Sequence, residues 1–175
     1  MVRSSAKLPT GPCWTSQIHT FLYFAYGSNL LKERLQLKNP SASIHCVARL
    51  KDYKLIFGNY KGLASDRWHG GVATIENSPA DEVWGVVWRM NVADLESLDS
   101  QENVRLGAYS PVEVNVKTRG QELNCRTYIM NSCIYAPPSP QYLKTLGTLQ
   151  SVERNVVNES GALYGYTVED EEKCK

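Results

Sequence analysis

The chain has 175 residues, which corresponds to about one domain with a single hydrophobic core. Hydrophobic residues make up 42% and charged residues 21%, ordinary globular usage that excludes wholesale disorder and collagen-like repeats. Lys and Arg number 19 against 18 Asp and Glu, so the net charge is +1. Such a chain has no general attraction to nucleic acid or to anionic membranes, and its specificity has to come from a local site.

Residues 1–20 contain Pro, Gly and Ser without an apolar repeat and are predicted to form a flexible leader. The longest apolar run, residues 21–26, is far shorter than the roughly 20 residues of a membrane-spanning helix. Five cysteines without a CxxC pair fit reduced thiols better than a disulfide framework or a zinc site. These features predict a cytoplasmic protein.

The first predicted strand is the aromatic run 21–26, which ends at Gly27. Leucines at roughly helical spacing then predict a helix that stops at residues 39–40, with Ser28 or Asn29 as its N-cap. The predicted order is therefore strand, glycine turn, helix.

The following segments are mostly extended. An alternating pattern predicts a strand over residues 44–57, followed by a polar, glycine-rich loop over 58–71. Residues 71–75 and 83–88 are expected to form the two strands of a hairpin, joined by a turn at 77–81.

A short helix is expected after Asn91, which can act as its N-cap, with Leu95 and Leu98 on one face. Two further strands, 109–117 and 123–130, surround a turn at residues 119–120. This order favours an α+β fold built on a mixed, mostly antiparallel, barrel-like sheet with flanking helices.

The turn at residues 26–29 is the first candidate site. A strand-to-helix turn exposes consecutive backbone N–H groups that suit a carboxylate, a phosphate or an oxyanion. An ordinary glycine turn is the alternative, because the phosphate-binding patterns GxxxxGK[ST] and GxGxxG are both absent.

Glu102 is the second candidate, since it follows the predicted helix that begins after Asn91. A carboxylate at a helix C-terminus meets the negative end of the dipole, so burial there would raise its pKa and make it a better base. A solvated acid at a fraying helix end is the alternative. The three histidines, His19, His45 and His69, have no metal-ligand spacing, and no metal site is predicted.

Several motifs, in order, resemble those of the γ-glutamylcyclotransferase family. They are FLYFAYGSNL at 21–30, WHGGVATI at 68–75, DEVWGVVW at 81–88, LDSQE at 98–102 and APPSPQY at 136–142. The resemblance implies a catalytic domain over residues 21–142. Residues 143–175 depart from the family pattern and are expected to form an atypical, acidic and partly disordered tail.

The resemblance also implies an activity, the cyclisation of γ-glutamyl amino acids to 5-oxoproline with release of the free amino acid. This lyase or acyltransferase-type step belongs to glutathione metabolism and requires no cofactor and no metal. The expected partner is a small γ-glutamyl amino acid, with a homodimer as an option and with neither nucleic acid nor membrane. The implied site consists of Glu102 as the catalytic acid and base and of the substrate-binding residues Tyr23, Phe24, Ala25, Tyr26, Gly27, Ser28 and Tyr128.

Proton transfer sets a condition on this site. With ordinary pKa values of about 4.3 for Glu and about 8 for an α-amine, transfer to Glu102 is uphill by roughly 3.7 pKa units, or about 5 kcal/mol. We therefore hypothesise that the site desolvates Glu102 and raises its pKa.

Two alternatives stay open at the level of sequence. A γ-glutamylamine cyclotransferase acting on γ-glutamyl-lysine shares the Tyr-Gly-Ser-Asn turn. A catalytically impaired binding or regulatory form is the other, because the atypical tail predicts lower stability or activity than in a full-length relative.

Overall fold

The computed structural model describes residues 18–144 and 146. Its elements are β1 (Thr20–Ala25), η1 (Ser28–Leu30), α1 (Lys32–Lys38), β2 (Ser43–Tyr60), β3 (Val72–Asn91), η2 (Val92–Asp94), α2 (Leu95–Gln101), β4 (Tyr109–Thr118), β5 (Gln121–Met130) and β6 (Cys133–Tyr135). Residues 140–144 are also helical. The predicted leader up to residue 17, and the predicted tail from residue 147 onward, lie outside the described residues.

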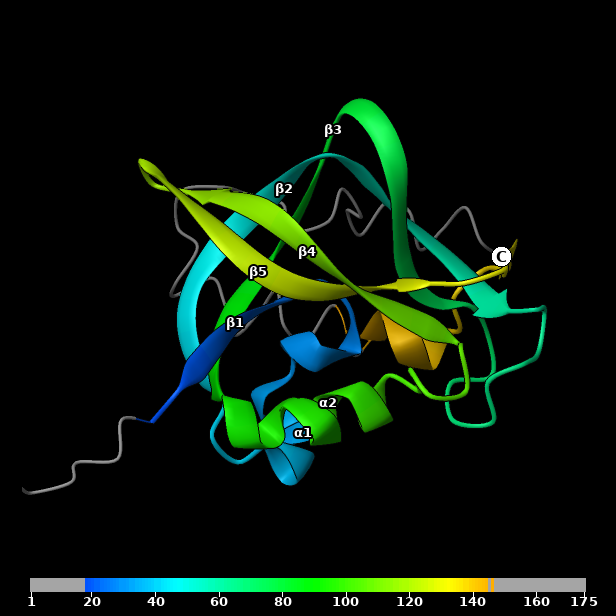
Figure 1. Ribbon diagram of the computed structural model, residues 1–175. Helices are drawn as coiled ribbons and strands as arrows, with labels where there is room; N and C mark the ends of the chain where they lie inside the picture. The colour runs from blue at the N-terminus through cyan, green and yellow to red at the C-terminus, as the bar shows by residue number, and fades with distance from the viewer. Residues whose placement is uncertain (1–17, 145, 147–175) are drawn as a thin grey trace, which may run out of the picture.

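Five strands close into a barrel (Figure 1). Their order is β3-β1-β5-β4-β2, and β2 pairs again with β3, while β6 lies on the outer side of β2. Neighbouring strands are antiparallel except for β1 and β5, which run parallel where Tyr23 lies opposite Arg126. The predicted α+β fold with a mostly antiparallel, barrel-like sheet is confirmed.

β1 positions the candidate site because it is the barrel strand between β3 and β5, and the site begins at the turn that follows it. Its last three residues are buried, as expected for a continuous apolar run that is covered on both faces. Phe24 lies against Gly85 of β3, where an added Cβ would come within 2.7 Å of the aromatic ring. This close packing fixes the end of β1, and with it the turn that begins at Gly27.

The predicted hairpin over residues 71–88 is wrong. β3 is one strand of 20 residues that pairs antiparallel with β2 along both of its halves. The pairing register shifts at Asp52, which has a φ of 65° and accepts a hydrogen bond from the Ala80 N–H at 3.2 Å. The turn-forming residues 77–81 therefore make a bulge at which both strands bend, and Pro79, which has no N–H, is tolerated there.

The helices lie next to each other on one side of the barrel (Figure 1). Ser97 of α2 donates a hydrogen bond to the Lys38 carbonyl of α1 at 2.8 Å. The predicted helix over the leucine-rich segment is confirmed and ends at Asn39, but neither Ser28 nor Asn29 caps it. Leu31 occupies the N-cap position, and the Asn29 side chain is directed elsewhere.

Other predictions at this level are mixed in outcome. The helix after Asn91 forms, as η2 followed by α2, although the Asn91 side chain makes no capping bond. The strands on either side of residues 119–120 form the β4–β5 hairpin. The predicted loop begins only after Tyr60, and the short strand β6 was not predicted. None of the helices in the described part of the chain is long and apolar enough to cross a membrane.

Candidate active site

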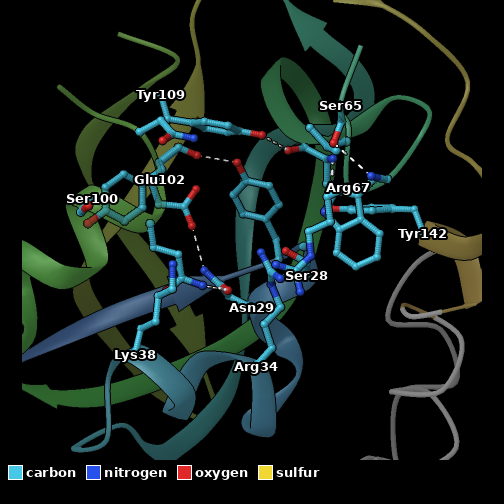
Figure 2. Close-up of a pocket in the computed structure, with 18 of the residues that line it drawn as sticks. Ser28, Asn29, Arg34, Lys38, Ser65, Arg67, Ser100, Glu102, Tyr109 and Tyr142 are labelled. Carbon is cyan, nitrogen blue, oxygen red and sulfur yellow. Dashed lines mark hydrogen bonds between the residues drawn. The ribbon is translucent and has the colours of Figure 1, made fainter. Parts of the chain in front are cut away.

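A pocket of about 430 Å³ opens where the turn after β1 meets the end of α2. Its lining includes five tyrosines and the three basic side chains Arg34, Lys38 and Arg67. The tyrosines are Tyr23, Tyr26, Tyr109, Tyr128 and Tyr142. Among the described residues that line the pocket, Glu102 is the sole carboxylate, and in Figure 2 it lies on the side of Ser100, away from Arg67 and Tyr142.

The end of α2 fixes the position of Glu102. Glu102 is the C-cap residue, and its backbone N–H donates to the Leu98 carbonyl at 3.1 Å. Asn103 follows in the left-handed conformation, with a φ of 51°. The N–H groups of Asn103 and Val104 bond to the carbonyls of Ser100 and Asp99, which is the pattern of a Schellman motif. Glu102 is thus held by a closed helix end rather than by a fraying one.

The surroundings of Glu102 favour its neutral form. The side chain is partly buried, and this burial raises its pKa from the ordinary value of 4.5 to about 7. Arg34 and the hydrogen bond from Asn29 act in the opposite direction, while Asp99 adds to the increase. Desolvation dominates, so the sequence-based hypothesis of a desolvated Glu102 with a raised pKa agrees with the structure.

A chain of three side-chain amides leads to the Glu102 carboxylate. Asn39 Nδ2 donates to Gln101 Oε1 at 2.9 Å, and Gln101 Nε2 donates to Asn29 Oδ1 at 3.0 Å. Asn29 Nδ2 then donates to Glu102 Oε1 at 2.8 Å and to the Tyr23 hydroxyl at 3.1 Å (Figure 2). Because the oxygen of Asn29 accepts from Gln101, its NH₂ group has to face Glu102.

The glycine turn packs closely against Tyr142. A Cβ at Gly27 would lie 3.1 Å from the Tyr142 hydroxyl oxygen and 3.2 Å from the Ala73 side chain, so a larger residue would require these neighbours to shift by a few tenths of an ångström. The Tyr142 hydroxyl accepts the Ala73 N–H at 3.1 Å and also bonds to the Ser28 backbone. Burial raises the pKa of Tyr142 to about 12, which keeps it a neutral hydroxyl.

Tyr128 is held by an ion pair between Arg126 of β5 and Asp99 of α2. Arg126 binds both carboxylate oxygens of Asp99, at 2.7 and 2.9 Å, and its Nε donates to the Tyr128 hydroxyl at 3.0 Å. The Tyr128 hydroxyl in turn donates to Asp99. The Tyr128 ring contacts Tyr23 edge to face at 5.8 Å, so these two pocket tyrosines support one another.

The comparisons with known proteins agree on one family. The AIG2-like family matches residues 82–153. A mouse γ-glutamylcyclotransferase is 62% identical over 128 residues, which cover 73% of this chain and 68% of the mouse protein. A human γ-glutamylcyclotransferase is 56% identical over 147 residues, which cover 83% of this chain and 76% of the human protein.

The chain belongs to the γ-glutamylcyclotransferase family. A solved structure named γ-glutamyl cyclotransferase is similar to the whole fold. It has a TM-score of 0.74 and 47% sequence identity, with 90% of this chain and all of that chain covered. The family resemblance seen in the sequence motifs is therefore confirmed.

Most of the site residues expected from the family motifs lie together. Glu102, Tyr23, Tyr26, Gly27, Ser28 and Tyr128 all line the pocket. Phe24 and Ala25 are not among its lining residues, because their side chains are buried in the core beside β3. Trp68, from the loop after β2, also lines it.

Other polar groups of this family site were missed by the sequence reasoning. Asn29 was interpreted as a possible helix cap and as part of the candidate turn at residues 26–29, but its side-chain contact with Glu102 was not predicted. Gln101, Arg34, Tyr109 and Tyr142 line the pocket as well. Asn29, Gln101 and Tyr142 lie inside the family motifs at 21–30, 98–102 and 136–142, which was their one available signal, whereas Arg34 and Tyr109 lie outside the quoted motifs. Among the described residues, no group of three His, Cys, Asp or Glu side chains could hold a metal ion.

Proposed function

We propose that this protein converts γ-glutamyl amino acids to 5-oxoproline and the free amino acid, with Glu102 as the proton-transferring group. The relatives at 56% and 62% identity carry the name γ-glutamylcyclotransferase. The observation that carries the proposal is the partly buried Glu102 carboxylate, held at the base of the pocket with a pKa of about 7.

The reaction needs no nucleophile from the protein. The substrate's α-amine attacks its own γ-carbonyl, so one carbon–nitrogen bond forms and the amide bond to the leaving amino acid breaks. The proton lost by the attacking amine passes to Glu102, which delivers a proton to the departing nitrogen. What the protein contributes is a folded substrate conformation, hydrogen bonds to the oxyanion and a base at the correct distance.

The raised pKa of Glu102 makes the first proton transfer feasible. With Glu102 at about 7 and an α-amine near 8, the transfer is uphill by roughly one pKa unit, or about 1.4 kcal/mol. With an ordinary Glu the same proton transfer is uphill by about 5 kcal/mol. The desolvated site therefore removes most of this barrier, and a base near neutral pKa is efficient at neutral pH.

The γ-glutamyl unit is proposed to bind beside the buried tyrosines that line the pocket. Tyr23, Tyr26 and Tyr128 are buried there, and the Gly27-Ser28 turn lies within the same pocket. Asn29 binds Glu102 by a charge-assisted hydrogen bond that holds one carboxylate oxygen and leaves the other for the substrate amine.

The test is to offer γ-glutamyl-alanine, γ-glutamyl-lysine and glutathione to the full chain and to measure 5-oxoproline. General acid–base catalysis contributes about 10² to 10⁴ in rate, so Glu102→Gln is expected to lose at least 10² while still binding substrate. The rate kcat/KM of the parent protein is expected to rise with pH through about 7, as Glu102 deprotonates.

Each result separates this function from its alternatives. Formation of 5-oxoproline from γ-glutamyl-lysine alone would favour a γ-glutamylamine cyclotransferase. Binding of all three compounds without product would favour an impaired binding form. Full activity in Glu102→Gln would contradict the role of Glu102.

The finer expectations on environment and assembly are part of the same proposal. We infer a cytoplasmic enzyme, supported by the free thiols Cys46, Cys125 and Cys133 and by the balanced charge. A homodimer is checked by light scattering of the purified chain. The division into residues 1–20, 21–142 and 143–175 stays a prediction, and the buried Leu146 lies in the last of these segments.

A further inference from the structure

Two arginines contact one indole ring in the lining of the pocket. The guanidinium carbons of Arg34, from α1, and Arg67, from the loop after β2, each lie 5.5 Å from the centre of the Trp68 ring. The ring itself is fixed by an edge-to-face contact with Tyr142 at 4.9 Å. Figure 2 shows Arg34 and Arg67 with Tyr142 on the side of the pocket that lies away from Tyr109.

These two cations form no direct ion pair with the described residues, although the charge of Glu102 raises the pKa of Arg34 and partly offsets the effects of burial and of Arg67. Within the described part of the chain, neither guanidinium forms an ion pair, and nothing accepts a hydrogen bond from Arg34 Nε. Burial lowers the pKa of Arg34, and the nearby positive charge of Arg67 lowers it further. With Lys38, three basic side chains and one carboxylate line the pocket, so its charge favours an anionic ligand.

The difference in exposure among the lining residues suggests how a substrate would be oriented in the pocket. Among the lining residues, Tyr23, Tyr26 and Tyr128 are buried, whereas Arg67 is exposed. The γ-glutamyl unit, which is common to all substrates, is proposed above to bind beside these buried tyrosines and Glu102. With the γ-glutamyl unit bound there, the leaving amino acid would extend toward the exposed side of the pocket, where Arg67 lies.

We propose that Arg67 and Arg34, which both contact the Trp68 ring, form a subsite for the carboxylate of the leaving amino acid. This inference rests on the proposed function and adds the group by which the enzyme selects its leaving amine. A planar guanidinium fork matches a carboxylate, and a bound carboxylate would relieve the repulsion between the two arginines. Donors that release an amine without a carboxylate are accordingly poor substrates.

The test compares γ-glutamyl-alanine with γ-glutamyl-ethylamide, which differs only by loss of the leaving-group carboxylate. The measured quantity is the ratio of kcat/KM for the first compound over the second. Because Arg67 is exposed, one charge-assisted bond there corresponds to about a tenfold preference. Arg67→Gln is expected to lower the ratio about tenfold, mainly by weakening γ-glutamyl-alanine. Arg67→Lys keeps the charge but lacks the planar guanidinium fork. Its ratio is expected to lie between that of the parent protein and that of Arg67→Gln.

Arg89→Gln is the matched control, since Arg89 is exposed on β3 and does not line the pocket. Its ratio should equal that of the parent. An unchanged ratio in Arg67→Gln, or an equal loss on both substrates, would overturn the subsite while leaving the cyclisation intact.

A binding measurement separates the subsite from catalysis. The affinities of Glu102→Gln for the same two compounds are compared by calorimetry, with and without Arg67→Gln. A preference for γ-glutamyl-alanine that disappears with Arg67→Gln supports the subsite. This holds even if the parent protein turns over neither compound, because the lack of turnover would contradict only the proposed function. Equal affinities for both compounds in Glu102→Gln would overturn the subsite.

Discussion

Glu102 shows how the requirements of one residue for chemistry and for stability conflict. Its pKa is about 7 in the folded protein and 4.5 ordinarily, because burial disfavours the charged form. Between these pH values the folded state binds more protons than the unfolded state, so the free energy of unfolding falls as pH rises. The contribution of protonated Glu102 is complete below pH 4.5 and is lost as the pH rises through 7. A base tuned for catalysis at neutral pH therefore costs stability at that pH.

Replacing this base with its neutral isostere should recover the lost stability. A shift of this size corresponds to at most about 3 kcal/mol, and less for a partly exposed side chain. Glu102→Gln is expected to raise the free energy of unfolding by about 1 to 3 kcal/mol at pH 8 and to leave it nearly unchanged at pH 4.5. Urea unfolding at both pH values checks this. The exposed Glu113→Gln is the control, and an equal gain there would mean that Glu102 is not the cause.

At the scale of an element, the last turn of α2 controls where the proposed base lies. The helix has seven residues, and its end is closed by the left-handed Asn103 and by two backbone hydrogen bonds. A left-handed conformation costs an ordinary L-residue roughly 1 kcal/mol or more, whereas asparagine and glycine adopt it readily. The backbone preference of Asn103 thus acts on the neighbouring Glu102.

Substitutions at Asn103 should separate this effect by residue type. Asn103→Ala is expected to lower the free energy of unfolding by about 1 kcal/mol and to reduce kcat, because the helix end and Glu102 shift together. Asn103→Gly should retain the stability and activity of the parent protein to within a few tenths of a kcal/mol. Thermal unfolding and 5-oxoproline formation give the two readouts. Equal behaviour of Ala and Gly would show that the left-handed turn is not the deciding factor.

The elements that could be predicted from the sequence are those whose signals are local. The aromatic run of β1 and the turn at residues 119–120 were placed correctly because apolar patterning and glycine act over a few residues. Residues 77–81 have the composition of a turn but form a bulge, since the outcome depends on Asp52 in the paired strand. The amide chain is similarly non-local, because Asn39 and Gln101 are 62 residues apart and meet only when α1 packs on α2.

At the scale of the whole molecule, barrel closure depends on how closely β1 approaches β3. A Cβ at Gly85 would lie 2.3 Å from the Ala25 carbonyl oxygen and 2.7 Å from the Phe24 ring. No real side chain tolerates such distances, so the two strands would have to separate. Because β1 lies between β3 and β5, that separation would affect the turn at Gly27 as well as the core.

Gly85→Ala is therefore expected to destabilise the fold far more than one methyl group normally does. Overpacking of a dense core costs about 1 to 3 kcal/mol, which would appear as a lower midpoint in urea unfolding. Glu113→Ala, on an exposed position of β4, should stay within about 0.5 kcal/mol of the parent protein. A Gly85→Ala protein as stable as this control would show that β1 and β3 can separate at little cost.

The seven residues of α1 connect the two charged groups that the pocket brings together. Arg34 belongs to this helix, and the amide chain to Glu102 begins at its end, where Asn39 Nδ2 also donates to the Leu35 carbonyl at 3.1 Å. Any rotation of α1 that moves Arg34 toward a bound carboxylate also pulls on Asn39, and through Gln101 and Asn29 on the carboxylate of Glu102. We therefore expect a ligand that displaces α1 to disturb the hydrogen bond to Glu102 without touching Glu102 itself.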